Sequence, residues 1–99
     1  MYVQITKSKI DGKKMTAIFY DENKKIIKTV HFGAAGYTDY TMPPHDKEKR
    51  KQYISRHRTN ENWEDPMSAG TLSRYILWEH PLLSTAINQY MKRFNLKKI

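Results

Sequence analysis

The chain has no cysteine among its 99 residues and only four glycines and four prolines. Without thiols, disulfides and thiolate-bound metal sites are excluded, so packing and hydrogen bonds alone must hold the fold. Its apolar runs are all far shorter than the roughly 20 residues that cross a bilayer, and its N-terminus lacks the basic-then-apolar order of a signal peptide. We therefore expect a soluble intracellular protein that makes no contact with membranes.

Positive charge, by contrast, is abundant. There are 18 Lys and Arg residues against 10 Asp and Glu residues, which gives a formal net charge of +8. A domain this basic attracts polyanions, and nucleic acid is the commonest of them. The basic excess is spread over residues 1–32, 45–58 and 92–98. Spread charge is suited to phosphate contacts without sequence specificity, and the simpler alternative is that it keeps a small protein soluble.

Alternating apolar residues in the first third predict a three-stranded antiparallel meander. The expected strands are residues 2–7, 15–20 and 26–32, and Asp11-Gly12 supplies the turn between the first two. The side chains expected to share one core are Val3, Ile5, Met15, Ala17, Phe19, Ile26, Val30 and Phe32. The other face mixes Ile18 with polar residues such as Thr16 and Thr29, so we expect it to meet solvent or a second subunit.

Residues 33–45 contain two glycines and two prolines, which predicts a loop. Asp46 follows as the expected N-cap of a charged helix that ends near Arg58, because its carboxylate suits the positive end of a helix. The stripe of this helix that can pack on the core is narrow and consists of Tyr53, Ile54 and His57.

Residues 59–70 predict an ordered loop, and two further helices should follow it. Ser68 is the expected N-cap of a short helix that His80-Pro81 ends, and Pro81 fits the first turn of the last helix. The apolar stripe of the last helix is Leu83, Ala86, Ile87, Tyr90 and Phe94. Residues 95–99 should fray. The prediction is one α+β domain over residues 1–99, with strands in 1–32, a loop in 33–45 and two or three helices in 46–99.

No catalytic or metal-binding pattern is present. The four histidines, His31, His45, His57 and His80, never show the spacing of a zinc site. No serine lies in a G-x-S-x-G setting, and the glycines after residue 32 lack the Lys and Ser/Thr of a phosphate-binding loop. We therefore expect no enzyme activity, metal or cofactor, and a small metal-dependent nuclease built around His57 is the weakest alternative.

Four aromatic residues could stack on bases: Tyr37, Tyr40, Trp63 and Trp78. For Trp78 a place in the core is favoured, packed with Leu72, Tyr75 and Ile76 against the stripe of the last helix. For Trp63, packing beneath its loop is favoured over contact with nucleic acid, because its acidic neighbours repel phosphate.

A spaced set of residues carries a resemblance to known proteins. The set is His31-Phe32-Gly33-Ala34, Gly36-Tyr37, Asp39-Tyr40-Thr41, Tyr53-Ile54, Arg56-His57, Trp63, Asp65-Pro66, Gly70, Ser73-Arg74 and Leu77-Trp78. In these residues, which cover about half of the chain, it is similar to a family of small basic proteins of large double-stranded DNA viruses of algae and amoebae. The resemblance implies a protein of the virion or of viral factories in the host cytoplasm, or of the nucleus. It implies association with the genome and neither enzyme activity nor cofactor.

Charge and resemblance together predict a virion-associated protein that binds double-stranded DNA without sequence preference or packages the genome. The phosphate contacts expected first are Lys47, Lys49, Arg50, Lys51, Arg56 and Arg58. Those expected second are Arg74, Lys92, Arg93, Lys97 and Lys98. The alternative is a non-enzymatic interaction protein that forms a homodimer or docks on other virion or host proteins.

Overall fold

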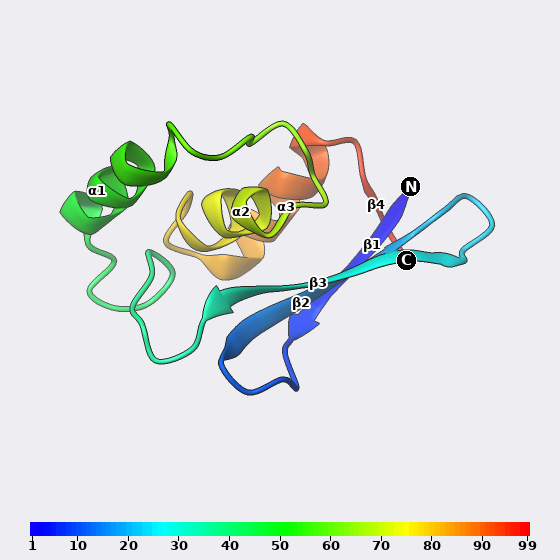
Figure 1. Ribbon diagram of the computed structural model, residues 1–99, viewed down its shortest axis with the longest axis horizontal. Coiled ribbons are helices and arrows are strands. Elements are labelled where there is room, and N and C mark those ends of the chain that lie inside the picture. Colours follow the sequence, from blue (N-terminus) through cyan, green and yellow to red (C-terminus); the bar gives the residue numbers. More distant parts are fainter.

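A computed structural model describes residues 1–99 as a four-stranded sheet with helices along one of its faces (Figure 1). The strands are β1 (Tyr2–Lys7), β2 (Lys13–Tyr20), β3 (Ile26–Ala34) and β4 (Lys97–Lys98), in the spatial order β3-β2-β1-β4. The first three strands pair antiparallel, and β4 pairs parallel to β1. The predicted α+β class and N-terminal meander are confirmed.

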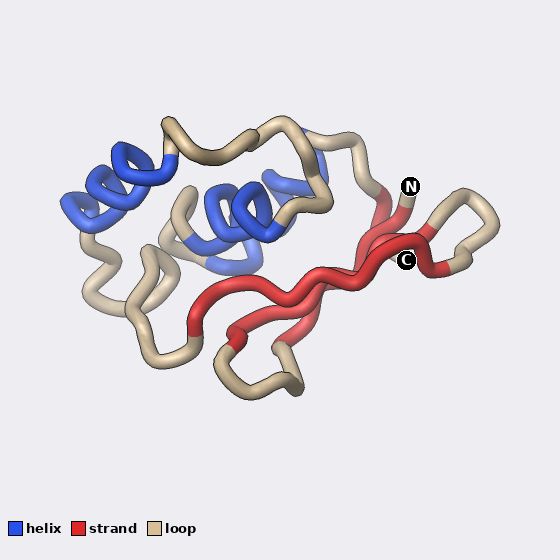
Figure 2. Tube along the Cα trace, in the orientation of Figure 1, coloured by secondary structure: helices blue, strands red, loops and turns tan.

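The helical elements are α1 (Lys47–His57), α2 (Ala69–Leu72), the π-helical segment η1 (Ser73–Leu77) and α3 (Leu83–Arg93), all on the same side of the sheet (Figure 2). Both predicted caps are confirmed. Asp46 accepts hydrogen bonds from the first backbone N–H groups of α1, and Ser68 accepts one from the N–H of Thr71. None of these helices has the length and apolar character needed to cross a bilayer.

The core lies between the sheet and the helices α2, η1 and α3. It consists of Val3, Met15, Ala17, Phe19, Val30, Phe32, Leu72, Ile76, Leu77, Tyr90 and Leu96. Tyr90 is fully buried, and its hydroxyl donates to the carbonyl oxygen of Pro66 at 2.5 Å. Burial raises the pKa of Tyr90, since the charged phenolate would lose its hydration. The Tyr90 side chain thus packs through the core from α3 and links this helix to the loop that contains Pro66.

Four details differ from the sequence prediction. Ile26 is 63% exposed and does not join the core, because a bulge shifts the β2–β3 register between Phe19 and Tyr20 and the helices do not cover the start of β3. The C-terminus does not fray: Leu96 is buried and the next two residues form β4. Pro81 precedes the last helix, which begins at Leu83. β3 also continues to Ala34, two residues beyond its expected end.

Candidate functional site

Helix α1 lies at one end of the molecule, beyond the sheet (Figure 1). An aromatic ring forms its first attachment to the rest of the chain. Tyr53 is the only buried residue of α1. Its ring stacks on Trp78, with centroids 4.5 Å apart and an interplanar angle of 7°, and it also stacks on His57 at 4.1 Å. Burial raises the pKa of Tyr53 to about 12. The three stacked rings join α1 to the segment that follows η1.

This stack corrects the prediction for Trp78. We expected its ring to pack against the apolar stripe of the last helix, yet it is half-buried and faces Tyr53 of α1. Helical spacing placed Trp78 beside Tyr75, but η1 has the wider turn of a π-helix and Trp78 has left the helix. Both changes alter the direction of the side chain. Trp78 is partly buried and packs against the edge of the hydrophobic core.

A shared carboxylate forms the second attachment of α1. Glu79 accepts hydrogen bonds from the guanidinium of Arg50 at 3.0 and 3.3 Å and from that of Arg74 at 3.0 Å. The Arg74 side chain is only 12% exposed, and its guanidinium lies over the rings of Trp63 and Tyr75. Two of the predicted phosphate contacts are thus engaged inside the protein.

An open groove of about 690 Å³ separates α1 from the end of the sheet. Its walls come from the start of β2, the end of β3 with the following loop, α1, and η1 with its flanks. The charged side chains that line it are Lys13, Lys14, Asp39, Lys49, Arg56 and Glu61. Much of the spaced residue set described above surrounds this groove, although its members are far apart along the chain.

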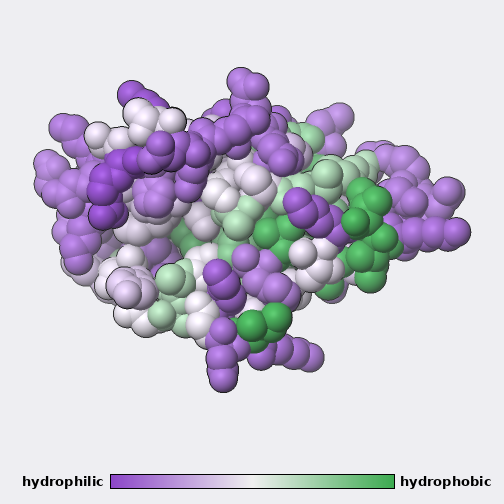
Figure 3. Space-filling model, viewed as in Figure 1, coloured by the Kyte–Doolittle hydropathy of each residue, from purple (hydrophilic) through white to green (hydrophobic).

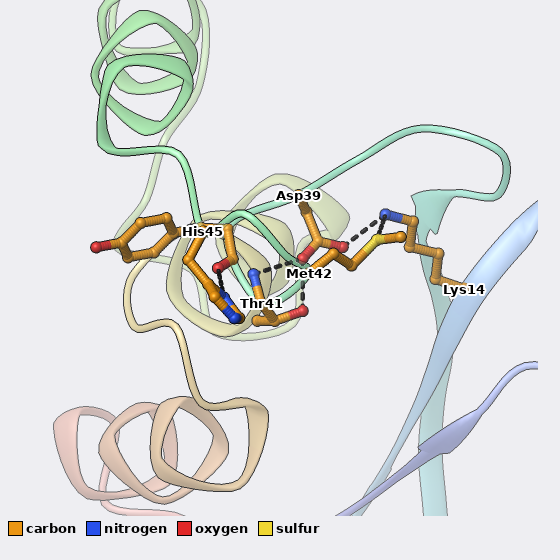
Figure 4. A network of polar contacts seen from close by, with 6 residues as sticks. Lys14, Asp39, Thr41, Met42 and His45 are labelled. Carbon is orange, nitrogen blue, oxygen red and sulfur yellow. Dashed lines mark hydrogen bonds and ion pairs between the residues drawn. The ribbon is translucent and has the colours of Figure 1, made fainter.

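The loop on one wall of the groove is tightly fixed. Asp39 is 4% exposed, and its carboxylate accepts hydrogen bonds from Lys14 of β2 at 2.5 Å and from the backbone N–H of Thr41 at 2.8 Å (Figure 4). Gly33 has a φ of +79°, and a Cβ atom there would lie 2.7 Å from the Leu77 side chain, so only glycine fits. The loop nevertheless presents Tyr37 to solvent with 72% of its surface exposed.

On the opposite wall, His57 is held by a carboxylate. Its Nδ1 atom lies 3.0 Å from Glu61, whose other oxygen accepts a hydrogen bond from the indole N–H of Trp63 at 2.8 Å. An ionised carboxylate can only accept, so Nδ1 of His57 carries a proton. A Cβ atom at Gly70 would lie 2.8 Å from Glu61, which explains the glycine there. No group of three or more His, Asp or Glu side chains comes together as a metal site.

The other nine predicted phosphate contacts fall into two regions of the chain. Helix α1 presents Lys47, Lys51 and Arg58 on its outer side, and Lys49 and Arg56 toward the groove. All five are exposed and none forms an ion pair. The surface over α1 is hydrophilic (Figure 3).

The second region is the C-terminal part of the chain, from the end of α3 to β4. Lys92 and Arg93 end α3, and Arg93 lies over the ring of Tyr75 at 4.3 Å. Lys97 and Lys98 form β4 on the edge of the sheet, on the other side of the molecule from α1 (Figure 1). Lys97 and Lys98 therefore lie away from the basic side chains of α1, whereas Lys92 and Arg93 line a pocket together with Glu79, the partner of Arg50.

The sequence prediction missed two basic residues of the groove, Lys13 and Lys14. They follow the Asp11-Gly12 turn directly, and the antiparallel pairing of β2 with β3 places them beside the end of β3. The pairing of Lys13 with Ala34 brings this lysine next to the loop that carries Tyr37. The register between β2 and β3 would have been needed to predict this position, and the sequence alone did not fix that register at this end of the sheet.

One comparison with known proteins gives a match. The model of a family of unknown function (DUF5754) matches residues 3–57, which is more than half of the chain. No curated protein and no solved structure matches. The matched segment contains β1 from Val3 onward, all of β2 and β3, the loop with Tyr37 and all of α1. It therefore includes three of the four walls of the groove.

Proposed function

This chain belongs to the DUF5754 family, and we propose that it binds DNA through phosphate contacts from α1, without preference for sequence. The observation that carries the proposal is the set of five exposed basic side chains on and beside α1, none of which has an acidic partner: Lys47, Lys49, Lys51, Arg56 and Arg58. Unpaired cations on an exposed helix gain most from a polyanion, because binding releases the counterions of the phosphates.

The arrangement also argues against readout of base sequence. The five side chains are distributed over two sides of α1 and are all Lys or Arg, so they suit phosphates that run past the helix. The net charge of +8 adds long-range attraction from the rest of the molecule. Packaging of a genome in virions requires this kind of binding, and the resemblance to small viral proteins supports that setting.

The test is a fluorescence-anisotropy titration of a labelled duplex of about 20 base pairs between about 50 and 200 mM salt. The wild type should lose affinity steeply with salt and bind unrelated sequences equally. The triple variant Lys47→Gln, Lys51→Gln, Arg58→Gln should bind more weakly and show a salt slope smaller by about 2 to 3, because each lost phosphate contact removes about 0.9.

The matched control is Lys9→Gln, Lys25→Gln, Lys28→Gln, which removes the same charge from exposed residues outside α1. Its salt slope should stay within about one of the wild-type value. Equal losses for the two triple variants would assign binding to net charge rather than to α1. Absence of binding at low salt would overturn the proposed function.

A second candidate function, self-association, is favoured by the free edge of the sheet. β3 has no partner on its outer side, and Ile26 and Ile27 at its start are exposed. Hydrophobic surface gathers over the sheet in the space-filling view (Figure 3). Exposed strand edges pair readily with a second copy. Light scattering over a range of concentrations should then show a dimer that Ile27→Lys dissociates, and a constant monomer mass would exclude it.

A further inference from the structure

The groove beside α1 has features that phosphate binding alone does not require. Tyr37 is exposed on a loop whose neighbouring residues are held by the Asp39 contacts and by the hydrogen bond from the Tyr40 N–H to Leu77. A fixed loop with an exposed aromatic ring offers a stacking surface that loses little entropy on binding. Across the groove, His57 extends the ring stack of Trp78 and Tyr53.

The charges of the groove favour an anionic ligand. Both carboxylates in its lining are already engaged, Asp39 with Lys14 and Glu61 with His57 and Trp63. Lys13, Lys49 and Arg56 have no acidic partner. A ligand with negative charge beside a flat ring therefore matches this site on two independent grounds.

We propose that the groove accepts an unpaired base of single-stranded DNA, stacked on Tyr37, while Lys49 and Arg56 bind the adjoining phosphates. This inference rests on the proposed function, since the same two basic residues belong to the phosphate-binding surface of α1. A base within a duplex is stacked on its neighbours and cannot enter the groove. Stacking on aromatic rings tolerates every base, so the lack of sequence preference is retained.

Anisotropy titrations with three probes test the inference: a thymidine oligomer of about ten nucleotides, an abasic oligomer of equal length, and a duplex. The wild type should bind the thymidine oligomer about tenfold more tightly than the abasic one. Tyr37→Ala should abolish this difference and leave the affinity for the duplex unchanged. The change leaves the core intact, because Tyr37 is exposed.

Two further variants separate stacking from charge. Tyr20→Ala, which removes a tyrosine at the far end of β2, should keep the preference for bases. Arg56→Gln should weaken binding of the thymidine and abasic oligomers by the same factor, because it removes a phosphate contact.

The outcomes also distinguish the two proposals. Equal binding of thymidine and abasic oligomers by the wild type, or no effect of Tyr37→Ala on their ratio, would overturn the stacking site while the phosphate-binding role of α1 stands. Failure of all three probes to bind at low salt would overturn both.

Discussion

Helices α1 and α3 are both 11 residues long, yet they use their residues in opposite ways. Helix α3 carries two basic residues at its end and buries Ala86 and Tyr90 in the core. Helix α1 carries five basic residues and one acidic residue and buries only Tyr53. Tertiary packing of an apolar face supplies most of the stability of a helix in a protein. The fold therefore depends on α3, whereas α1 contributes little to the core and can carry many charged residues at its surface.

The comparison also predicts a difference in dynamics. Helix α3 is held by the core, whereas α1 is held by the Tyr53–Trp78 stack and by the Arg50–Glu79 pair. Segments with few buried contacts open locally at low free-energy cost. We expect α1 to undock and fray while the sheet and α3 remain folded.

The largest effect is expected from Leu72→Ala. Leu72 is fully buried in the cluster between the sheet and the helices, so the variant leaves a cavity that should cost about 2 to 5 kcal/mol of global stability. The measurement is the midpoint of urea denaturation. An unchanged midpoint would show that this cluster is not what holds the domain together.

Trp78→Ala should have a smaller and local effect. The ring is half-buried and its stacking partner belongs to α1, so we expect a loss of about 2 kcal/mol, below the 3 to 5 typical of a fully buried tryptophan. Hydrogen exchange should accelerate in α1 and stay slow in α3. Equal acceleration in both helices would place Trp78 in the main core instead.

Glu79→Gln should cost about 1 to 2 kcal/mol, since two guanidinium groups lose the charge of their shared carboxylate. Glu64→Gln makes the same change in net charge at an exposed residue that forms no ion pair, so it should leave stability unchanged. Both variants are compared by urea denaturation. Identical midpoints would contradict the view that Glu79 anchors α1.

The smallest effect concerns alkaline pH. The pKa of Tyr53 is raised to about 12 by burial, so the folded state keeps a proton that the unfolded chain loses near pH 10. This contribution to stability is complete below pH 10 and falls as pH rises toward 12. At about pH 10.5 the free energy of unfolding should be about 0.8 kcal/mol lower than at neutral pH because of Tyr53. In Tyr53→Phe the decrease in the free energy of unfolding over this pH range should be smaller by that amount. An unchanged pH dependence in Tyr53→Phe would show that the ring is accessible to water.

Sequence patterns that involve residues close together in the chain predicted most of the fold. Alternation defined the meander, and the capping residues Asp46 and Ser68 marked two helix starts, because these features depend on neighbours in the sequence. The groove was not predictable in the same way. Its walls depend on the β2–β3 register, on the π-helical turn that redirects Trp78, and on the ion pair between Lys14 and Asp39. The register and the ion pair join segments far apart in the chain, and the residues of 73–77 carry no pattern that distinguishes a π-helical from an α-helical turn.

The most direct test of the division between the two helices is hydrogen exchange measured with and without duplex DNA at low salt. Binding through α1 should slow exchange in residues 47–57 and leave residues 83–93 unchanged, because bound phosphates hold α1 in place while α3 is already protected by the core. Slowed exchange confined to residues 83–93, with none in α1, would contradict the account.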